Sequence, residues 1–307
     1  MTAAQRRVPH ASDLTHAVQD ALASSSYRPP VLPSVALDVM ALAGQRDVDL
    51  AEVVKLLERD PVLAARVLAL AQSAQYARRS PVVTLKQAAV RLGLEALTHL
   101  VLQAALALRI FRVPGFEAFA ARVNQHATAT AHVTRDVCRR AGIPGEHAFT
   151  AGLLHDIGLS SALLLVTERT EWRRLRFEEI APVLDAVHAD VSGLLARRWK
   201  LPEPLPTILA SHHRASLDGV AHPVNAALIV AEQLCWEAGA GILEPPAGAT
   251  ATTAALPEQP MDGLDATWPS VVKEALGIVR LDGDALCAAR VAAFDVVGSL
   301  GAGAAPG

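Results

Sequence analysis

Cysteine is scarce in this chain of 307 residues: it has only Cys138, Cys235 and Cys287. The three lie far apart, their number is odd, and no pair has the Cys-x-x-Cys spacing. This pattern excludes a disulfide framework and a zinc finger, and it favours a reducing compartment, so a cytoplasmic protein is expected. The first residues carry charge with no apolar segment behind them, so no secretory signal is expected.

Aromatic residues are also few, at 4% of the chain, while Ala, Leu and Val dominate a hydrophobic content of 51%. This balance favours helices packed on helices over a β-sandwich or barrel. Long uninterrupted hydrophobic runs are missing too. The most apolar stretch, 94–111, is short of a bilayer span and contains Glu95, His99, Gln103 and Arg109. We expect it to be a buried core helix and expect no membrane insertion.

The chain has no excess of basic charge, because its formal net charge is −3. The one local arginine cluster, at 169–176, is interleaved with glutamates, which is typical of a solvated helix face. Nucleic-acid binding requires a positive surface. It is therefore not expected, and a salt-sensitive gel shift would be needed to revive it.

Helix signals recur along the chain and predict an all-α, two-lobed helical bundle. Asp60-Pro61 is typical of a helix start, with an N-cap followed by proline at the first helical position. Gly93 fits a helix stop, and Pro114-Gly115 marks the break between the lobes. The predicted organisation is a tail with a short helix (1–26), a smaller N-terminal helical lobe (27–113), a second lobe (114–237), a linker or long loop (238–260), C-terminal helices packing on the core (261–300) and a disordered tail (301–307).

Histidine is concentrated in one part of the chain, since seven of the eleven lie between His126 and His213. His126 is expected inside a long helix. His155 and Asp156 end an apolar segment, and His188 is expected inside a later helix. A helical bundle can aim such side chains from several helices at one interior point.

The remaining candidates come from the end of the second lobe. A short helix is predicted from Leu205 to His213, and Glu232 lies in a helix that Pro223 begins. Pro182 is likewise predicted to begin the helix that contains His188. The candidate metal ligands are therefore His126, His155, Asp156, His188, His212, His213 and Glu232.

The adjacent pair His155 and Asp156 indicates which chemistry these ligands could support. The carboxylate could bridge two cations about 3.5–4 Å apart, an arrangement that activates a water and clamps a phosphate. Imidazoles with one or two carboxylates suit Fe, Mn, Zn or Ni better than Ca or Mg. His155 and Asp156 are thus the catalytic candidates, while the alternative is a hydrogen-bonded pair that binds no metal. The other histidines are assigned to ordinary structural roles: His10, His16, His99, His132, His147 and His222.

The same residues resemble the HD superfamily of phosphohydrolases. Leu-Leu-His-Asp-Ile-Gly at 153–158, with the other histidines named above, resembles the branch that contains the HD-GYP and HDOD domains. Asp-Pro-Val-Leu-Ala-Ala-Arg-Val-Leu at 60–68 and Ala-Ala-Val-Arg-Leu-Gly-Leu at 88–94 are similar to the N-terminal lobe of HDOD domains. Trp-Lys-Leu-Pro at 199–202 is similar to the segment before their His-His pair. The resemblance covers roughly 27–237 and identifies the second lobe as HD-like.

The resemblance implies a function, because HDOD domains are regarded mainly as regulatory or output modules of bacterial signalling. We therefore expect a bacterial signal-transduction module that acts through protein partners without catalysis, with a nucleotide as a candidate ligand. The alternative is a metal-dependent phosphohydrolase or phosphodiesterase acting on a nucleotide or cyclic dinucleotide.

The chain also departs from the family pattern. Glu232 stands approximately where the last HD aspartate is expected, and Leu159 stands where a lysine often follows. Gln72-Ser73 replaces Asn-Ser in the first lobe. Nothing after His213 resembles Gly-Tyr-Pro, which disfavours the cyclic-di-GMP phosphodiesterase branch.

Overall fold

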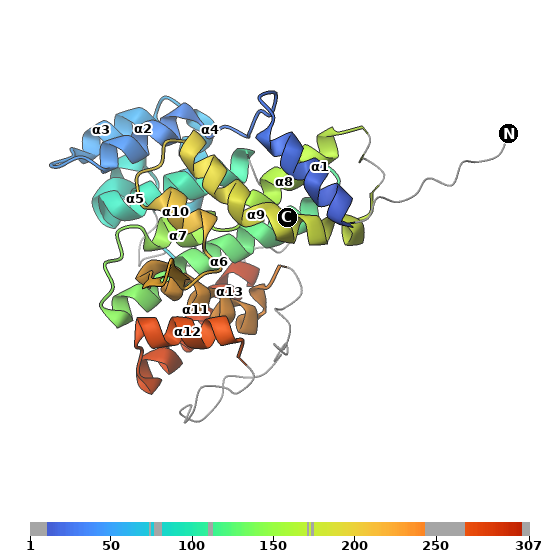
Figure 1. Ribbon diagram of the computed structural model, residues 1–307. Helices are drawn as coiled ribbons and strands as arrows, with labels where there is room; N and C mark the ends of the chain where they lie inside the picture. The colour runs from blue at the N-terminus through green and yellow to red at the C-terminus, as the bar shows by residue number, and fades with distance from the viewer. Residues whose placement is uncertain are drawn as a thin grey trace.

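The structure is a computed structural model, and it describes residues 11–73, 75–76, 82–109, 113–170, 172, 175–242 and 268–302. Helices make up nearly all of this part of the chain (Figure 1). Its only strands are β1 (Ser216–Leu217) and β2 (Val220–Ala221), which pair antiparallel. The prediction of an all-α fold is confirmed.

The N-terminal part contributes five helices. These are α1 (Ala11–Ala23), α2 (Ser34–Ala43), α3 (Leu50–Leu57), α4 (Pro61–Ala71) and α5 (Leu85–Arg109). Helices α2, α3 and α4 pack on α5, while α1 packs on two helices of the second lobe, α8 (Ile157–Glu168) and α9 (Phe177–Arg198) (Figure 1). Asp60 caps α4 as expected, since its carboxylate accepts from the N–H groups of Val62 and Leu63. Gly93 leaves the helical conformation, with φ 79°, and a second helical segment follows it directly.

The second lobe and the C-terminal part contribute the other helices. These are α6 (Glu117–Ala141), α7 (Ala148–Leu154), α8 (Ile157–Glu168), α9 (Phe177–Arg198), α10 (Leu205–Ala210), α11 (Pro223–Cys235), the π-helix η1 (Trp236–Ala240), α12 (Ser270–Val279) and α13 (Gly283–Ala302). Figure 1 shows α11 to α13 together on one side of α6, away from α2 to α4. Helices α12 and α13 both pack on α11, and α13 also packs on α6.

Two helix boundaries predicted from proline and histidine positions are wrong. Helix α9 begins at Phe177, and Pro182 lies inside it. The start is set earlier because the Glu179 carboxylate accepts from the Arg176 N–H at 2.7 Å. Helix α10 ends at Ala210, so His212 and His213 lie in the turn that follows it.

The start of the predicted linker differs from expectation as well. Residues 238–240 continue the helix as part of η1, which ends only at Ala240. The rest of that linker beyond residue 242, the first ten residues (His10 included) and residues 303–307 lie outside the described residues.

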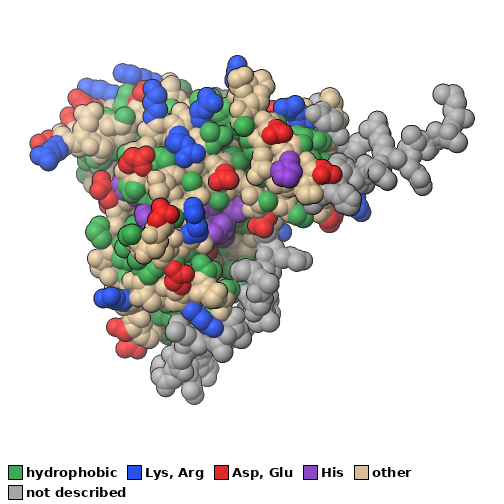
Figure 2. All heavy atoms as spheres, in the orientation of Figure 1, with side chains coloured by type: hydrophobic (Ala, Val, Ile, Leu, Met, Phe, Trp, Pro, Cys, Tyr) green, Lys and Arg blue, Asp and Glu red, His purple; other side chains and the backbone are tan. Residues whose placement is uncertain are grey.

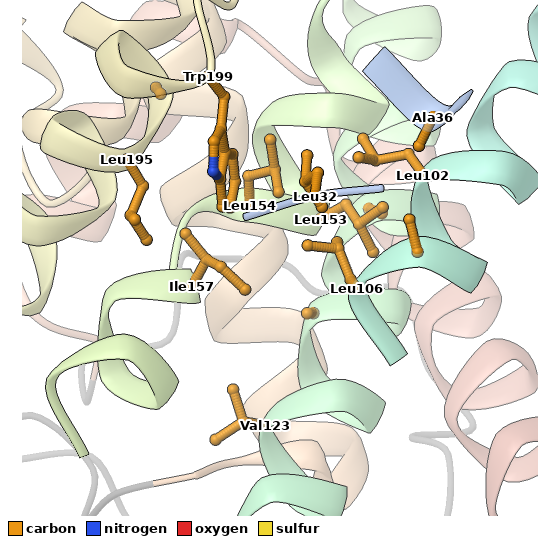
Figure 3. Packing of buried hydrophobic residues seen from close by; sticks show 14 of the residues in the cluster. Leu32, Ala36, Leu102, Leu106, Val123, Leu153, Leu154, Ile157, Leu195 and Trp199 are labelled. Atoms are coloured by element: carbon orange, nitrogen blue, oxygen red, sulfur yellow. The ribbon is translucent and has the colours of Figure 1, made fainter. Parts of the chain in front are cut away.

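The hydrophobic core has two parts. One joins the N-terminal helices to α7, α8, α9 and α10, and the other joins α6 to α11, α12 and α13. In Figure 3, Leu102 and Leu106 of α5 lie beside Leu153 and Leu154 of α7. The apolar residues before His155 therefore hold the end of α7 between the two lobes.

Two helical stretches, Leu85–Leu108 and Ala148–Glu168, are long and apolar enough to cross a membrane by composition alone. More than half of the first and almost all of the second is buried inside the protein. Most of the described part of the apolar stretch 94–111 is buried, as expected for a core helix. Basic and acidic side chains are interspersed over the face shown in Figure 2.

Candidate metal centre

The His155-Asp156 pair lies at the junction of α7 and α8, where the chain changes direction. The Ser192 hydroxyl of α9 fixes this junction, because it donates to the His155 carbonyl at 2.6 Å and accepts from the Gly158 N–H at 2.9 Å. A Cβ on Gly158 would overlap the main-chain carbonyl of His188. Glycine at this position therefore lets α8 approach α9 closely enough to bring His188 beside Asp156.

The first ligand group consists of His126, His155, Asp156 and Glu232. The His155 Nε2 atom lies 3.1 Å from His126 Nε2, 3.3 Å from Asp156 Oδ2 and 3.4 Å from Glu232 Oε1. His126 Nε2 lies 3.7 Å from the same Oδ2 atom. Helices α6 and α11 and the α7–α8 junction thus bring two imidazoles and two carboxylates to one point.

The second ligand group consists of His188, His212 and His213. The Nε2 atoms of His188 and His213 are 2.7 Å apart. The other carboxylate oxygen of Asp156, Oδ1, lies 3.4 Å from His188 Nε2 and 3.5 Å from His212 Nε2. Asp156 therefore stands between the two groups and presents one oxygen to each.

Main-chain carbonyls orient four of the five imidazoles. Because a carbonyl only accepts, each Nδ1 in these pairs is the donor, and in a neutral ring Nε2 then carries the lone pair. The Nδ1 pairs are His126 with Ala240 (2.9 Å), His155 with Gly152 (2.8 Å), His188 with Asp185 (2.7 Å) and His212 with Leu209 (2.8 Å). All four rings thus aim an electron pair into the cluster, as metal-ligating histidines do.

These residues fit a divalent cation. Asp156 Oδ1 and His212 Nε2 are buried and make no hydrogen bond within the described part of the chain, which is costly unless another partner is bound. Ligand bonds of about 2.0–2.1 Å place neighbouring nitrogens about 3.3–3.4 Å apart in a tetrahedral site and about 2.8–3.0 Å apart at right angles. The 3.1 Å between the Nε2 atoms of His126 and His155 lies between these two values.

Charge within the cluster is strongly coupled. Burial opposes the charged form of His155, but the carboxylates of Asp156 and Glu232 outweigh it and raise the pKa of this imidazole. Burial likewise opposes the charged form of Asp156, but His155 holds its pKa well below the usual range. For Glu232, burial is again outweighed, and the hydrogen bond with His155 lowers the pKa to about 2. The two carboxylates thus favour positive charge at this point of the cluster.

Within the described part of the chain, the ligands differ in their exposure to solvent. His155 and His212 are fully buried, and His126, Asp156 and His188 are nearly so. Glu232 is partly exposed and His213 is exposed. A ligand from solution would therefore meet His213 and Glu232 first.

The residues that support the ligands could not be recognised from the sequence. Ser192 holds the His-Asp junction, and the Asn225 amide holds the turn after α10 by donating to the carbonyls of Ser211 (2.9 Å) and Arg214 (3.2 Å). No local pattern marks either residue. Leu159 is buried, so the position where the resemblance places a lysine is part of the core.

Histidines outside the candidate set serve other contacts. His99 stacks on Phe149 with ring centroids 3.9 Å apart, and His132 meets the edge of the same ring. Burial lowers the pKa of His99 to about 3 and that of His132 to about 4. His222 accepts from the Asn225 N–H at the start of α11.

Comparison with known proteins identifies the family. The sequence model of the HDOD domain matches residues 30–215, more than half of the chain. The chain belongs to the HDOD domain family. A Treponema pallidum (strain Nichols) relative, described only as uncharacterized, is 29% identical over 197 residues, which are 60% of this chain and 37% of that protein. This HDOD chain thus spans well under half of that relative's length.

Solved structures share the fold over nearly the whole chain. An HDOD domain protein of unknown function from Geobacter sulfurreducens is 22% identical, with a TM-score of 0.61, covering 93% of this chain and 99% of its own. A candidate metal-dependent phosphohydrolase from Shewanella amazonensis SB2B is 16% identical, with a TM-score of 0.65 and coverage of 94% and 99%. A candidate signal transduction protein from Marinobacter aquaeolei VT8 is 19% identical, with a TM-score of 0.58 and coverage of 95% and 66%. At these identities the likeness shows the fold alone.

Proposed function

We propose that this HDOD protein is a signal-transduction module that binds two divalent cations in its HD-like lobe and acts through a protein partner without catalysis. The position of Asp156 carries the metal-binding part. Its Oδ2 atom faces the first ligand group and its Oδ1 atom faces the second, at 3.3 to 3.5 Å from three imidazoles. The cations best suited to such ligands are Fe, Mn, Zn or Ni.

Two features support a role without turnover. Among the described residues, five of the seven ligands are buried, and a phosphate ester would first meet the other two, His213 and Glu232. The positive charges that lower the pKa of Asp156 and Glu232 come from histidines. No lysine contributes at the position where the family often has one, because this chain has Leu159 there. Partner action rests on family membership, since regulatory output is what the HDOD resemblance implies.

The second candidate function is a metal-dependent phosphohydrolase acting on a nucleotide or cyclic dinucleotide. The observation that favours it is the shared carboxylate of Asp156 between two ligand groups. Two cations bridged in this way would supply an activated water and neutralise phosphate charge. In that case the two ligand groups would hold the cations, and His213 and Glu232, the two ligands that reach solvent, would lie nearest the substrate.

Metal analysis followed by an activity assay separates the two functions. The purified full chain is expected to carry about one to two Fe, Mn, Zn or Ni ions, to lose them in Asp156→Ala, and to retain them in Asp190→Ala, an exposed aspartate of α9. The metal-loaded protein is then incubated with nucleotides and cyclic dinucleotides in Mn²⁺ or Fe²⁺. Turnover present in wild type and absent in Asp156→Ala would contradict the proposal of a module without catalysis. A metal-free wild type would contradict both functions.

The partner part needs a separate test. Tagged wild-type chain expressed in its source cells should retain a protein through purification, and the same protein should bind the isolated chain directly. If wild type and Asp156→Ala bind the partner protein equally well, the metal has a structural role and does not control partner binding. Absence of any direct protein partner would contradict partner action.

A further inference from the structure

The π-helix η1 brings the C-terminal part of the chain to the metal centre. It continues α11, and its Gly239 adopts φ 89°, which turns the chain back toward α6. The Ala240 carbonyl then accepts from His126 Nδ1 at 2.9 Å. The orientation of one ligand in the first group therefore depends on the path of η1.

A second side chain of α6 holds the same segment. Arg122 lies one helical turn before His126, and its Nη2 atom donates to the carbonyls of Gly241 at 2.9 Å and Ile242 at 2.8 Å. Three consecutive carbonyls, at residues 240, 241 and 242, thus face one side of α6. Gly241 packs directly against the Trp236 ring, where a Cβ would overlap it.

Glu237 ties this segment to the C-terminal helices. Its Oε1 atom accepts from Trp268 Nε1 at 2.7 Å and from Gln233 Nε2 at 3.2 Å. Its Oε2 atom lies 2.9 Å from Arg290 Nε of α13, with the two side chains 7% and 15% exposed. Removing one partner of such a buried ion pair leaves the other charge uncompensated, so Glu237 couples the position of η1 to α13.

We propose that Glu237 is a positioning residue for the first ligand group. By joining η1 to Trp268 and Arg290, it fixes the Ala240 carbonyl that orients His126, and the C-terminal helices thereby set the metal affinity of this group. The proposal rests on the metal centre described above. Outer partners that orient a ligating histidine change metal affinity by about 10–100-fold.

The effect is selective because the second group is anchored elsewhere. The carbonyls that orient His188 and His212 belong to Asp185 of α9 and Leu209 of α10. Neither residue is part of η1 or the C-terminal helices. A change at Glu237 should therefore weaken one cation and spare the other.

Titration of the metal-free full chain with Mn²⁺ alone tests this selectivity. Glu237→Gln should weaken one of two binding steps by about tenfold and leave the other unchanged. Glu274→Gln is the matched control, because Glu274 is a carboxylate of α12 that accepts from the Ser216 hydroxyl at 2.7 Å. Two steps identical to wild type in Glu237→Gln, or two steps weakened equally, would overturn the proposal.

Thermal melting distinguishes positioning from a general loss of stability. A purely structural role lowers the melting temperature equally with and without Mn²⁺, whereas a positioning role also shrinks the stabilisation that Mn²⁺ adds. Arg290→Lys, a milder change of the same ion pair, should show the same selective loss if Glu237→Gln fails to fold. A wild-type chain that binds no Mn²⁺ would overturn the metal centre itself, whereas normal binding in both variants would overturn only the role of Glu237.

Discussion

The two ligand groups of the HD-like lobe are built in different ways. The first joins distant parts of the chain: His126 and the Ala240 carbonyl that orients it are 114 residues apart. The second is more local, with His188 and His213 separated by 25 residues. The first contains two carboxylates, while the second consists of imidazoles that share Asp156 Oδ1.

Because of this difference, we expect the metal affinity of each group to depend on a different part of the structure. The first group takes its ligands and supports from α6, α11 and η1, and α13 packs on all three. We therefore expect its geometry to depend on how α13 packs. The second depends on α9 and on one turn after α10, with His213 open to solvent. Asp156 contacts both groups. A substitution of Asp156 should therefore affect both groups, a substitution of another ligand should affect one group, and a substitution of a supporting residue should affect one group more weakly.

Asp156→Asn should have the largest effect, because it removes the charge from both groups while keeping the size of the side chain. We expect both cations to bind more weakly by at least about 100-fold, beyond what a lost outer partner causes. Calorimetric titration with Mn²⁺ or Zn²⁺ measures this, with Asp190→Asn as the control. Retention of one tight site would show that the groups do not share this carboxylate.

The paired substitutions His155→Ala and His212→Ala should each remove one cation. His155 belongs to the first group and His212 to the second, so each variant loses a ligand bond in one group only. Metal content by mass spectrometry should fall from two ions to about one in each single variant and to none in the double variant. If either single variant loses both ions, the groups are a single site.

Asn225→Ala should have a smaller effect that is confined to the second group. Its amide holds the turn that carries His212 and His213, so its loss should weaken one Mn²⁺ step by about tenfold. Ser192→Ala is the comparison, since Ser192 holds the carbonyl of His155 in the first group. If both variants weaken the same Mn²⁺ binding step, Asn225 and Ser192 do not support different ligand groups.

The sequence predicted the elements whose signals are local. Asp60-Pro61 begins α4 because the aspartate caps the very next residues, and the long helix around His126 follows from its own composition. The candidate ligands could be listed because histidine and aspartate are rare inside apolar segments. The structure places the seven side chains in two groups, which Asp156 links through its two carboxylate oxygens.

The features that were missed depend on contacts between distant residues. The early start of α9 is set by the Glu179 side chain rather than by Pro182. The end of α10 is held by Asn225, which lies on α11. The position of the Ala240 carbonyl could not be predicted, because the contacts beside it, Arg122 with Ile242 and Arg290 with Glu237, join residues far apart in the sequence.

The shared carboxylate of Asp156 is tested most directly by anomalous X-ray scattering from crystals of the Mn²⁺-loaded protein. We expect two peaks about 3.5–4 Å apart, one beside each ligand group, with one oxygen of Asp156 bound to each ion. A single peak, or two peaks of which only one contacts Asp156, would contradict it.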